Sequence, residues 1–110
     1  MKIDFTYLET ISDGDNDFII QFIETYEQTI NSLVDKMDGE LAASDFVNLG
    51  KTAHQLKPSA KMIGLSSGSL LEELQDNPDN ANTETLAFIR RDCFDGLGEL
   101  KKWAKEKGVE

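Results

Sequence analysis

The sequence is poor in cysteine, proline and histidine, with one Cys, two Pro and one His among 110 residues. A single cysteine, Cys93, excludes a disulfide within the chain. A zinc site needs about four cysteine, histidine or carboxylate ligands, so Cys93 and the distant His54 do not indicate one. A catalytic triad is not indicated either, because His54 is the only imidazole and no Gx[SC]xG segment accompanies it. We therefore predict no metal site and no cofactor, and read Cys93 as a small buried apolar residue.

Long hydrophobic runs are also missing. No apolar stretch approaches the ~20 residues that cross a bilayer. Residues 1–10 have neither the basic start nor the apolar stretch of a signal peptide. These features predict a cytoplasmic protein without a membrane partner. A chain of this length suits one domain, so we expect residues 1–110 to form a single domain, and Met1 favours a free-standing protein.

Basic residues are few, since 11 Lys and Arg face 21 Asp and Glu, for a net charge of −10. This balance argues against nucleic acid as a partner, because phosphate backbones need clustered bases. The charge is unevenly distributed. Residues 44–71 hold three lysines and one aspartate, a net charge of +2, which leaves −12 for the rest of the chain. The only histidine lies within this basic segment.

Apolar residues recur at intervals of three and four, which is the signature of amphipathic helices. The apolar stripes cover residues 18–37, 46–63, 70–74 and 86–104, and the third is the shortest. Thr6 and Glu9 have the spacing of a capping box and predict a short first helix. The fold class is therefore all-α, an antiparallel four-helix bundle with a short extra N-terminal helix. Because four stripes can close on one another, we expect a monomer.

The breaks between the stripes carry residues that begin or end helices. An acidic turn at residues 13–16 precedes the first long stripe, and Gly64 ends or bends the second. Two further starts leave a choice of capping residue, either Ser44 or Asp45 and either Asn82 or Thr83. Gly39 is compatible with the end of the first long helix or with its interior.

One flank of the helix over residues 46–63 combines the histidine with lysines. Ala53 and Leu56 point to the core, so we expect His54, about 100° around the helix from Ala53, at the edge of the apolar stripe or outside it. Helical spacing places five residues on the same flank as His54: Gly50, Lys51, Lys57, Pro58 and Lys61. A neutral imidazole is a good nucleophile, and ammonium groups disfavour its protonated form and attract a phosphoryl group. Gly50 is expected to leave room beside the histidine.

The segment His54–Gly64, with the sequence HQLKPSAKMIG, resembles the signature of histidine phosphotransfer (HPt) domains. In that family a histidine is followed by leucine at +2, lysine at +3, small residues from +4 and glycine at +10. The positions that match are His54, Leu56, Lys57, Ser59, Ala60 and Gly64. The helix pattern is similar to the family over most of the chain.

The resemblance implies a function. HPt domains are helical bundles that accept a phosphoryl group on an exposed histidine from a receiver-domain aspartate and pass it to another, without a nucleotide site. His54 would be the phosphorylated residue of this phosphocarrier, and Lys57 its main electrostatic partner. Lys51 and Lys61 follow from helix spacing alone, and for them a solvated helix face is an equal alternative. Receiver domains of response regulators or hybrid kinases would dock on the exposed face around Gly50, His54, Pro58 and Lys61.

The sequence departs from the family at Pro58, where HPt domains usually have glycine. A proline inside a helix lacks an N–H and crowds the carbonyl four residues earlier, which belongs to His54. We therefore expect a kink or a widened turn at the histidine. Pro58 is also the one feature that supports a second hypothesis, in which the chain is a helical adaptor that binds a signalling protein without accepting phosphate.

The acidic residues Asp13, Asp15, Asp17 and Glu24 have the spacing of a calcium loop. Such a loop needs glycine at its sixth position, where this chain has Phe18. A helix-capping turn accounts for these acids better than a calcium site.

Overall fold

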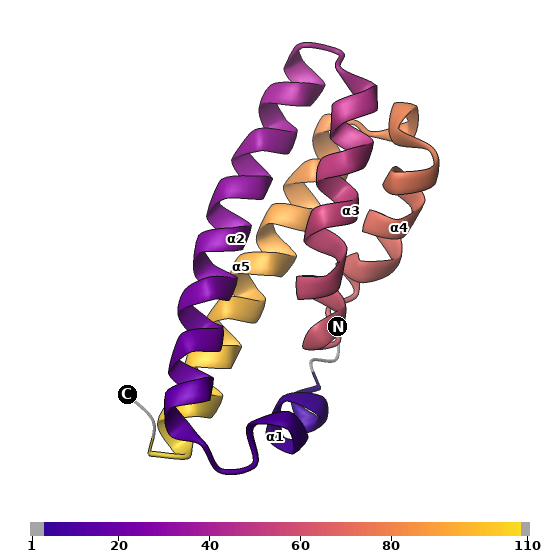
Figure 1. The fold of residues 1–110 in the computed structure, drawn as a ribbon. Helices are drawn as coiled ribbons and strands as arrows, with labels where there is room; N and C mark the ends of the chain where they lie inside the picture. The colour runs from indigo at the N-terminus through magenta and orange to yellow at the C-terminus, as the bar shows by residue number, and fades with distance from the viewer. Residues whose placement is uncertain (1–3, 109–110) are drawn as a thin grey trace.

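The structure is a computed structural model in which residues 4–108 are described, and these residues form helices and connecting turns without a strand. The elements are α1 (Thr6–Ser12), α2 (Asn16–Ala42), α3 (Phe46–Met62), α4 (Ser67–Asp76), the 3-10 turn η1 (Pro78–Asn80) and α5 (Thr83–Glu106). Figure 1 shows α2 and α5 side by side along the molecule, α3 beside them, α4 on the outer side of α3, and α1 at the base. Consecutive long helices run in opposite directions, so the predicted antiparallel bundle with a short first helix is confirmed.

Side chains just before each long helix satisfy its first N–H groups. The Asp15 carboxylate accepts a hydrogen bond from the Phe18 N–H, and Asp45, rather than Ser44, accepts one from Asn48. Asn82, rather than Thr83, caps α5. Gly39 lies inside α2, and α3 ends at Met62, just before Gly64, whose φ of +72° suits glycine.

The start of α1 differs from the prediction. Thr6 is the first residue of the helix, and its N–H donates to the Asp4 side chain, so the capping box predicted for Thr6 and Glu9 is wrong. Glu9 instead contacts the end of α5, where it accepts a hydrogen bond from Trp103 Nε1 at 3.2 Å and pairs with Lys107 Nζ at 3.1 Å. The contact with Lys107 lowers the pKa of Glu9. These polar contacts attach α1 to α5.

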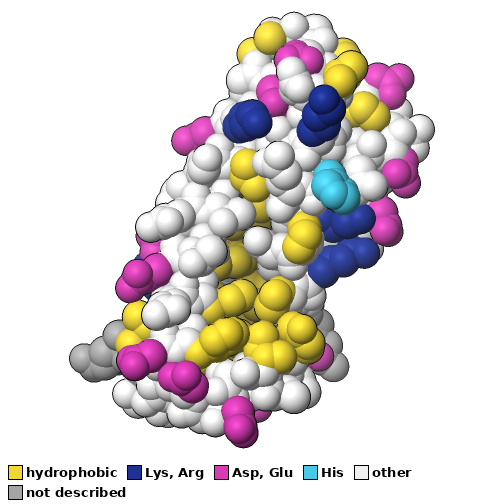
Figure 2. Space-filling model, in the orientation of Figure 1, with side chains coloured by type: hydrophobic (Ala, Val, Ile, Leu, Met, Phe, Trp, Pro, Cys, Tyr) yellow, Lys and Arg dark blue, Asp and Glu magenta, His cyan; other side chains and the backbone are white. Residues whose placement is uncertain are grey.

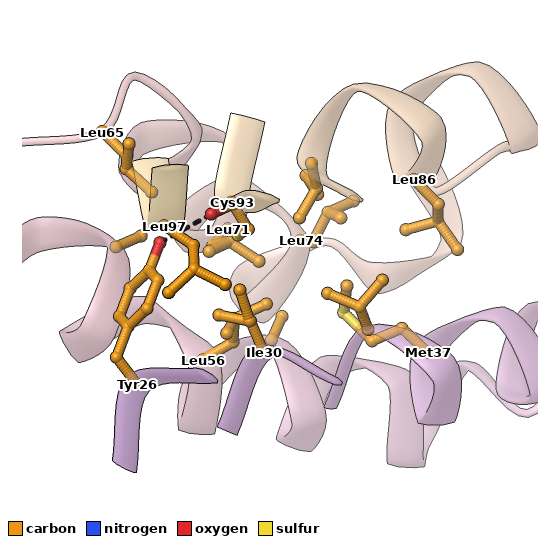
Figure 3. Packing of buried hydrophobic residues seen from close by; sticks show 14 of the residues in the cluster. Tyr26, Ile30, Met37, Leu56, Leu65, Leu71, Leu74, Leu86, Cys93 and Leu97 are labelled. Atoms are coloured by element: carbon orange, nitrogen blue, oxygen red, sulfur yellow. Dashed lines mark hydrogen bonds between the residues drawn. The ribbon is translucent and has the colours of Figure 1, made fainter. Parts of the chain in front are cut away.

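The core contains the apolar stripes that the sequence predicts. From α3 and the residue that follows it, the core includes five residues at alternating intervals of four and three, all fully or almost fully buried: Leu49, Ala53, Leu56, Ala60 and Ile63. Figure 3 shows Tyr26 of α2 reaching across the core, where its hydroxyl donates a 2.9 Å hydrogen bond to the carbonyl of Cys93. Burial raises the pKa of Tyr26. Cys93 is buried, as predicted.

Residues 4–108 contain neither a cluster of metal ligands nor a helix that could span a membrane. No group of three or more His, Cys, Asp or Glu side chains there could hold a metal ion. None of the helices in this range has the length and apolarity that a bilayer crossing requires.

Candidate functional site

His54 lies on the outer face of α3, and the opposite face of this helix packs in the core. Ala53 and Leu56 are fully buried, and this fixes the rotation of α3 so that His54 faces outward. Figure 2 shows the histidine exposed on one face of the molecule, with basic side chains on either side of it. His54 therefore lies outside the buried stripe, which is one of the two positions that the sequence predicts.

The His54 ring makes one hydrogen bond to α4. Its Nδ1 lies 2.9 Å from Oε1 of Gln75, near the end of α4. Because an amide oxygen accepts, this contact favours the neutral tautomer with its proton on Nδ1, which leaves the lone pair on Nε2. The sequence analysis missed Gln75. The signal that could have found it is its place one residue after Leu74, on the flank of the α4 stripe.

The position of α4 depends on a buried carboxylate from α5. Asp92 is 3% exposed and accepts a 2.8 Å hydrogen bond from the N–H of Ser67, the first residue of α4. A negative charge at a helix N-terminus is favourable, because the first N–H groups lack partners within the helix. Asp92 therefore helps to fix α4, and with it Gln75, relative to α3.

The three predicted lysines have different surroundings. Lys57 Nζ lies 3.8 Å and Lys61 Nζ 3.5 Å from the same Oε1 of Glu72 on α4. Lys51 has no ion pair with an acid of the described residues, and it lines a hollow beside the histidine. Glu72 lies one residue beyond residues 44–71, the segment whose charge the sequence indicated as basic, so it was not among the predicted site residues.

The hollow beside His54 lies between α3 and the end of α4 with η1, and has a volume of about 430 Å³. Its lining residues come from both sides of this gap: Val47, Gly50, Lys51, His54, Gln55, Gln75 and Pro78. It is open, and it has cationic, imidazole and amide groups together with the exposed apolar side chain of Val47. Such a hollow suits a small anionic group carried by a partner.

Gly50 is buried, which corrects the prediction that it belongs to the exposed docking face and leaves space beside the histidine. A Cβ at this position would lie 3.3 Å from both Cβ and Cγ of Pro78, and 3.5 Å from the carbonyl oxygen of Gln75. The space that a side chain would fill is therefore occupied by η1. Gly50 allows η1 and the end of α4 to approach α3 closely.

Pro58 is exposed one turn after His54, within a helix that is continuous from Phe46 to Met62. It has no N–H to donate to the carbonyl of His54, as its chemistry requires. The helix continues by one turn beyond the proline, so Pro58 does not end α3. Its ring adds an apolar surface next to the imidazole.

The chain was also compared with known proteins. A family model, described as the Hpt domain, matches residues 21–100, from the first turns of α2 to the last turns of α5. This range is well over half of the chain and includes His54, Gln75 and the lysines. Neither the curated proteins nor the solved structures gave a match.

Proposed function

The chain belongs to the Hpt domain family, and on this basis we propose that His54 carries the phosphoryl group in a two-component phosphorelay. The family gives the chain a general role in histidine phosphotransfer, as a phosphocarrier with receiver domains as partners. The observation that carries the assignment to His54 is its uniqueness, since the sequence has no other histidine. Its exposure on the surface of α3 supports the same choice.

In the proposed step, Nε2 of His54 attacks the phosphorus of an aspartyl phosphate on the receiver. The N–P bond forms while the P–O bond to the aspartate breaks, and the electron pair of that bond remains on the aspartate carboxylate. The proton on Nδ1 stays in place, so the ring becomes positively charged and its hydrogen bond to Gln75 strengthens. Transfer to a second receiver aspartate is the reverse of this step. Any Mg²⁺ belongs to the receiver.

The lysine side chains near His54 stabilise the phosphoryl group that is transferred to it. Phosphoryl transfer depends mainly on positioning and on charge stabilisation, and Lys57 lies one helical turn from His54. We propose Lys57 as its electrostatic partner. Lys51, which lines the hollow without an acidic partner among the described residues, is proposed as a contact for the receiver, as are Lys61 and the exposed ring of Pro58. Gly50 is buried, and its proposed role is to leave room for Pro78 to pack against α3.

The test is transfer from a phosphorylated receiver, made with radioactive phosphate, to the purified chain. The wild type should acquire a label that is stable to base and labile to acid, and His54→Gln should acquire none. Lys57→Ala should slow transfer, while Lys102→Ala, an exposed lysine near the end of α5, should transfer at the wild-type rate. Full labelling of His54→Gln would contradict the proposal. Receiver binding without any labelling of the wild type would favour the adaptor instead.

A further inference from the structure

Glu72 of α4 is paired with two of the lysines next to His54. Its Oε1 lies 3.8 Å from Lys57 Nζ and 3.5 Å from Lys61 Nζ. We propose that Glu72 is an internal counterion that competes with the phosphoryl group for Lys57, and so sets how phosphate divides between His54 and a receiver aspartate. This inference rests on the proposed function of His54.

The register between α3 and α4 brings these groups together. The helices are antiparallel, and His54 contacts Gln75 while Lys57, three residues later on α3, pairs with Glu72, three residues earlier on α4. The His54–Gln75 contact and the Lys57–Glu72 pair are thus successive contacts along the interface between α3 and α4. A change at Glu72 therefore acts one helical turn from the atom that is phosphorylated.

Lys61 forms a second ion pair with Glu72 at the interface between α3 and α4. A Cβ at Gly68, on the first turn of α4, would lie only 3.0 Å from Cγ of Lys61. The aliphatic part of the Lys61 side chain therefore packs against α4 at the glycine, where α4 has no side chain. From there Lys61 Nζ reaches Glu72. When Lys57 leaves Glu72, the carboxylate retains Lys61 as a partner. Glu72 is also half exposed to water, at 52%, whereas the Lys57 side chain is 20% exposed.

The consequence is an exchange of partners. In the unphosphorylated chain Lys57 faces Glu72, and after transfer it faces a phosphoryl group on Nε2 that carries more negative charge than a carboxylate. The carboxylate competes with the phosphoryl group for the charge of Lys57, so it disfavours the phosphorylated state. Glu72 thereby favours transfer onward to a receiver.

The test is the equilibrium constant for phosphate between this chain and a receiver, measured from the label on each protein after equilibration. This constant compares separated proteins, so it does not depend on how tightly they dock. Removing the charge with Glu72→Gln should shift the constant toward His54 by about two- to fivefold, the range of a partly exposed ion pair. The matched control is Glu73→Gln, the next residue, which is exposed and has no ion pair within the described part of the chain.

Two further measurements separate a direct charge effect from a structural one. The shift caused by Glu72→Gln should shrink as salt rises, because salt screens exposed charges. It should disappear in a Lys57→Gln background and persist in a Lys61→Gln background. Thermal unfolding of each variant shows whether the bundle is intact.

Several results would overturn the inference. These are an unchanged equilibrium constant in Glu72→Gln, an equal shift in Glu73→Gln, or a shift that survives in the Lys57→Gln background. They differ from failure of the proposed function, which would appear as an unlabelled wild type or as labelling of His54→Gln. In that case the inference about Glu72 falls with it.

Discussion

Nδ1 of His54 and Oε1 of Gln75 lie 2.9 Å apart, so a residue of α4 favours the neutral tautomer of the α3 imidazole that has its proton on Nδ1. The two residues are 21 positions apart, and only the packing of α3 against α4 joins them. Rotation of the ring and choice of tautomer are thus properties of the helix pair. Nε2, the nucleophile of the proposed transfer step, belongs to an exposed side chain.

Loss of this hydrogen bond should slow phosphotransfer. In Gln75→Leu the ring loses its acceptor, the two tautomers become similar in energy, and the developing ring charge has no partner. The net value of such a bond, about 0.5–1.5 kcal/mol, corresponds to a rate lower by roughly 2- to 13-fold. The measurement is the transfer rate from a phosphorylated receiver. Gln28→Leu, at an exposed position of α2, is the control, and equal rates in both variants would remove Gln75 from the mechanism.

The buried Asp92 carboxylate should contribute to stability through the start of α4. In Asp92→Ala the N–H of Ser67 is left buried without its acceptor, which costs about 1–3 kcal/mol of the free energy of unfolding. Urea unfolding monitored by circular dichroism measures this loss. Asp95→Ala, three residues along α5 and exposed, should change stability by no more than about 0.5 kcal/mol. A similar loss in both variants would show that Asp92 has no special role.

Two glycines of α5 should respond to alanine with opposite signs. A Cβ at Gly96 would lie 2.8 Å from Cδ2 of Leu65 and 3.1 Å from the Tyr26 hydroxyl, so Gly96→Ala should destabilise the bundle by about 1–3 kcal/mol. Gly98 has no atom within 4 Å of such a Cβ, and there the better helix propensity of alanine should add up to ~1 kcal/mol. Thermal unfolding of the pair tests both signs, and destabilisation by Gly98→Ala would contradict the packing described.

Stability should fall at alkaline pH through Cys93. Burial, with a smaller effect of the Asp92 charge, raises the pKa of the Cys93 thiol from 9.0 to about 12. The unfolded chain therefore loses this proton above about pH 9 while the folded chain retains it, and the unfolded state then binds fewer protons. The contribution of this thiol to the free energy of unfolding is therefore fully present below pH 9. It is lost between pH 9 and 12, by at most about 1.4 kcal/mol per pH unit.

Urea unfolding at several pH values measures this slope. Cys93→Ala should show a shallower decrease above pH 9 than the wild type. Part of the decrease should remain, because burial also raises the pKa of Tyr26. Identical slopes in the two proteins would show that the thiol is not the titrating group.

The sequence predicts the helices of this fold better than it predicts the contacts of the site. Stripes such as Leu49, Ala53 and Leu56 are periodic, so they indicate both a helix and its buried face, and the outward direction of His54 follows from them. The partners of His54 and Lys57 on α4 depend instead on how two helices are aligned. A stripe of three leucines specifies the buried face of α4 but not its position along α3.

Gly50 illustrates the same limit. The pattern of α3 alone predicts open space at Gly50 beside the histidine, since helical spacing puts this glycine on the His54 flank. Pro78 occupies that place, and the polar loop that contains Pro78 carries no periodic pattern that could reveal where it packs. The missing side chain is explained by a neighbour distant in the sequence.

Both prolines of this chain border the histidine, with Pro58 one turn after it and Pro78 against Gly50 one turn before it. A proline ring has a fixed φ and almost no side-chain freedom to lose. Pro78 lines the same hollow as His54 and Pro58 is exposed one turn further along α3, so in the proposed complex a docking receiver does not have to immobilise either ring. In the proposed complex, the entropic cost of association at this surface falls mainly on the lysine side chains, whose contacts change in the proposed transfer step.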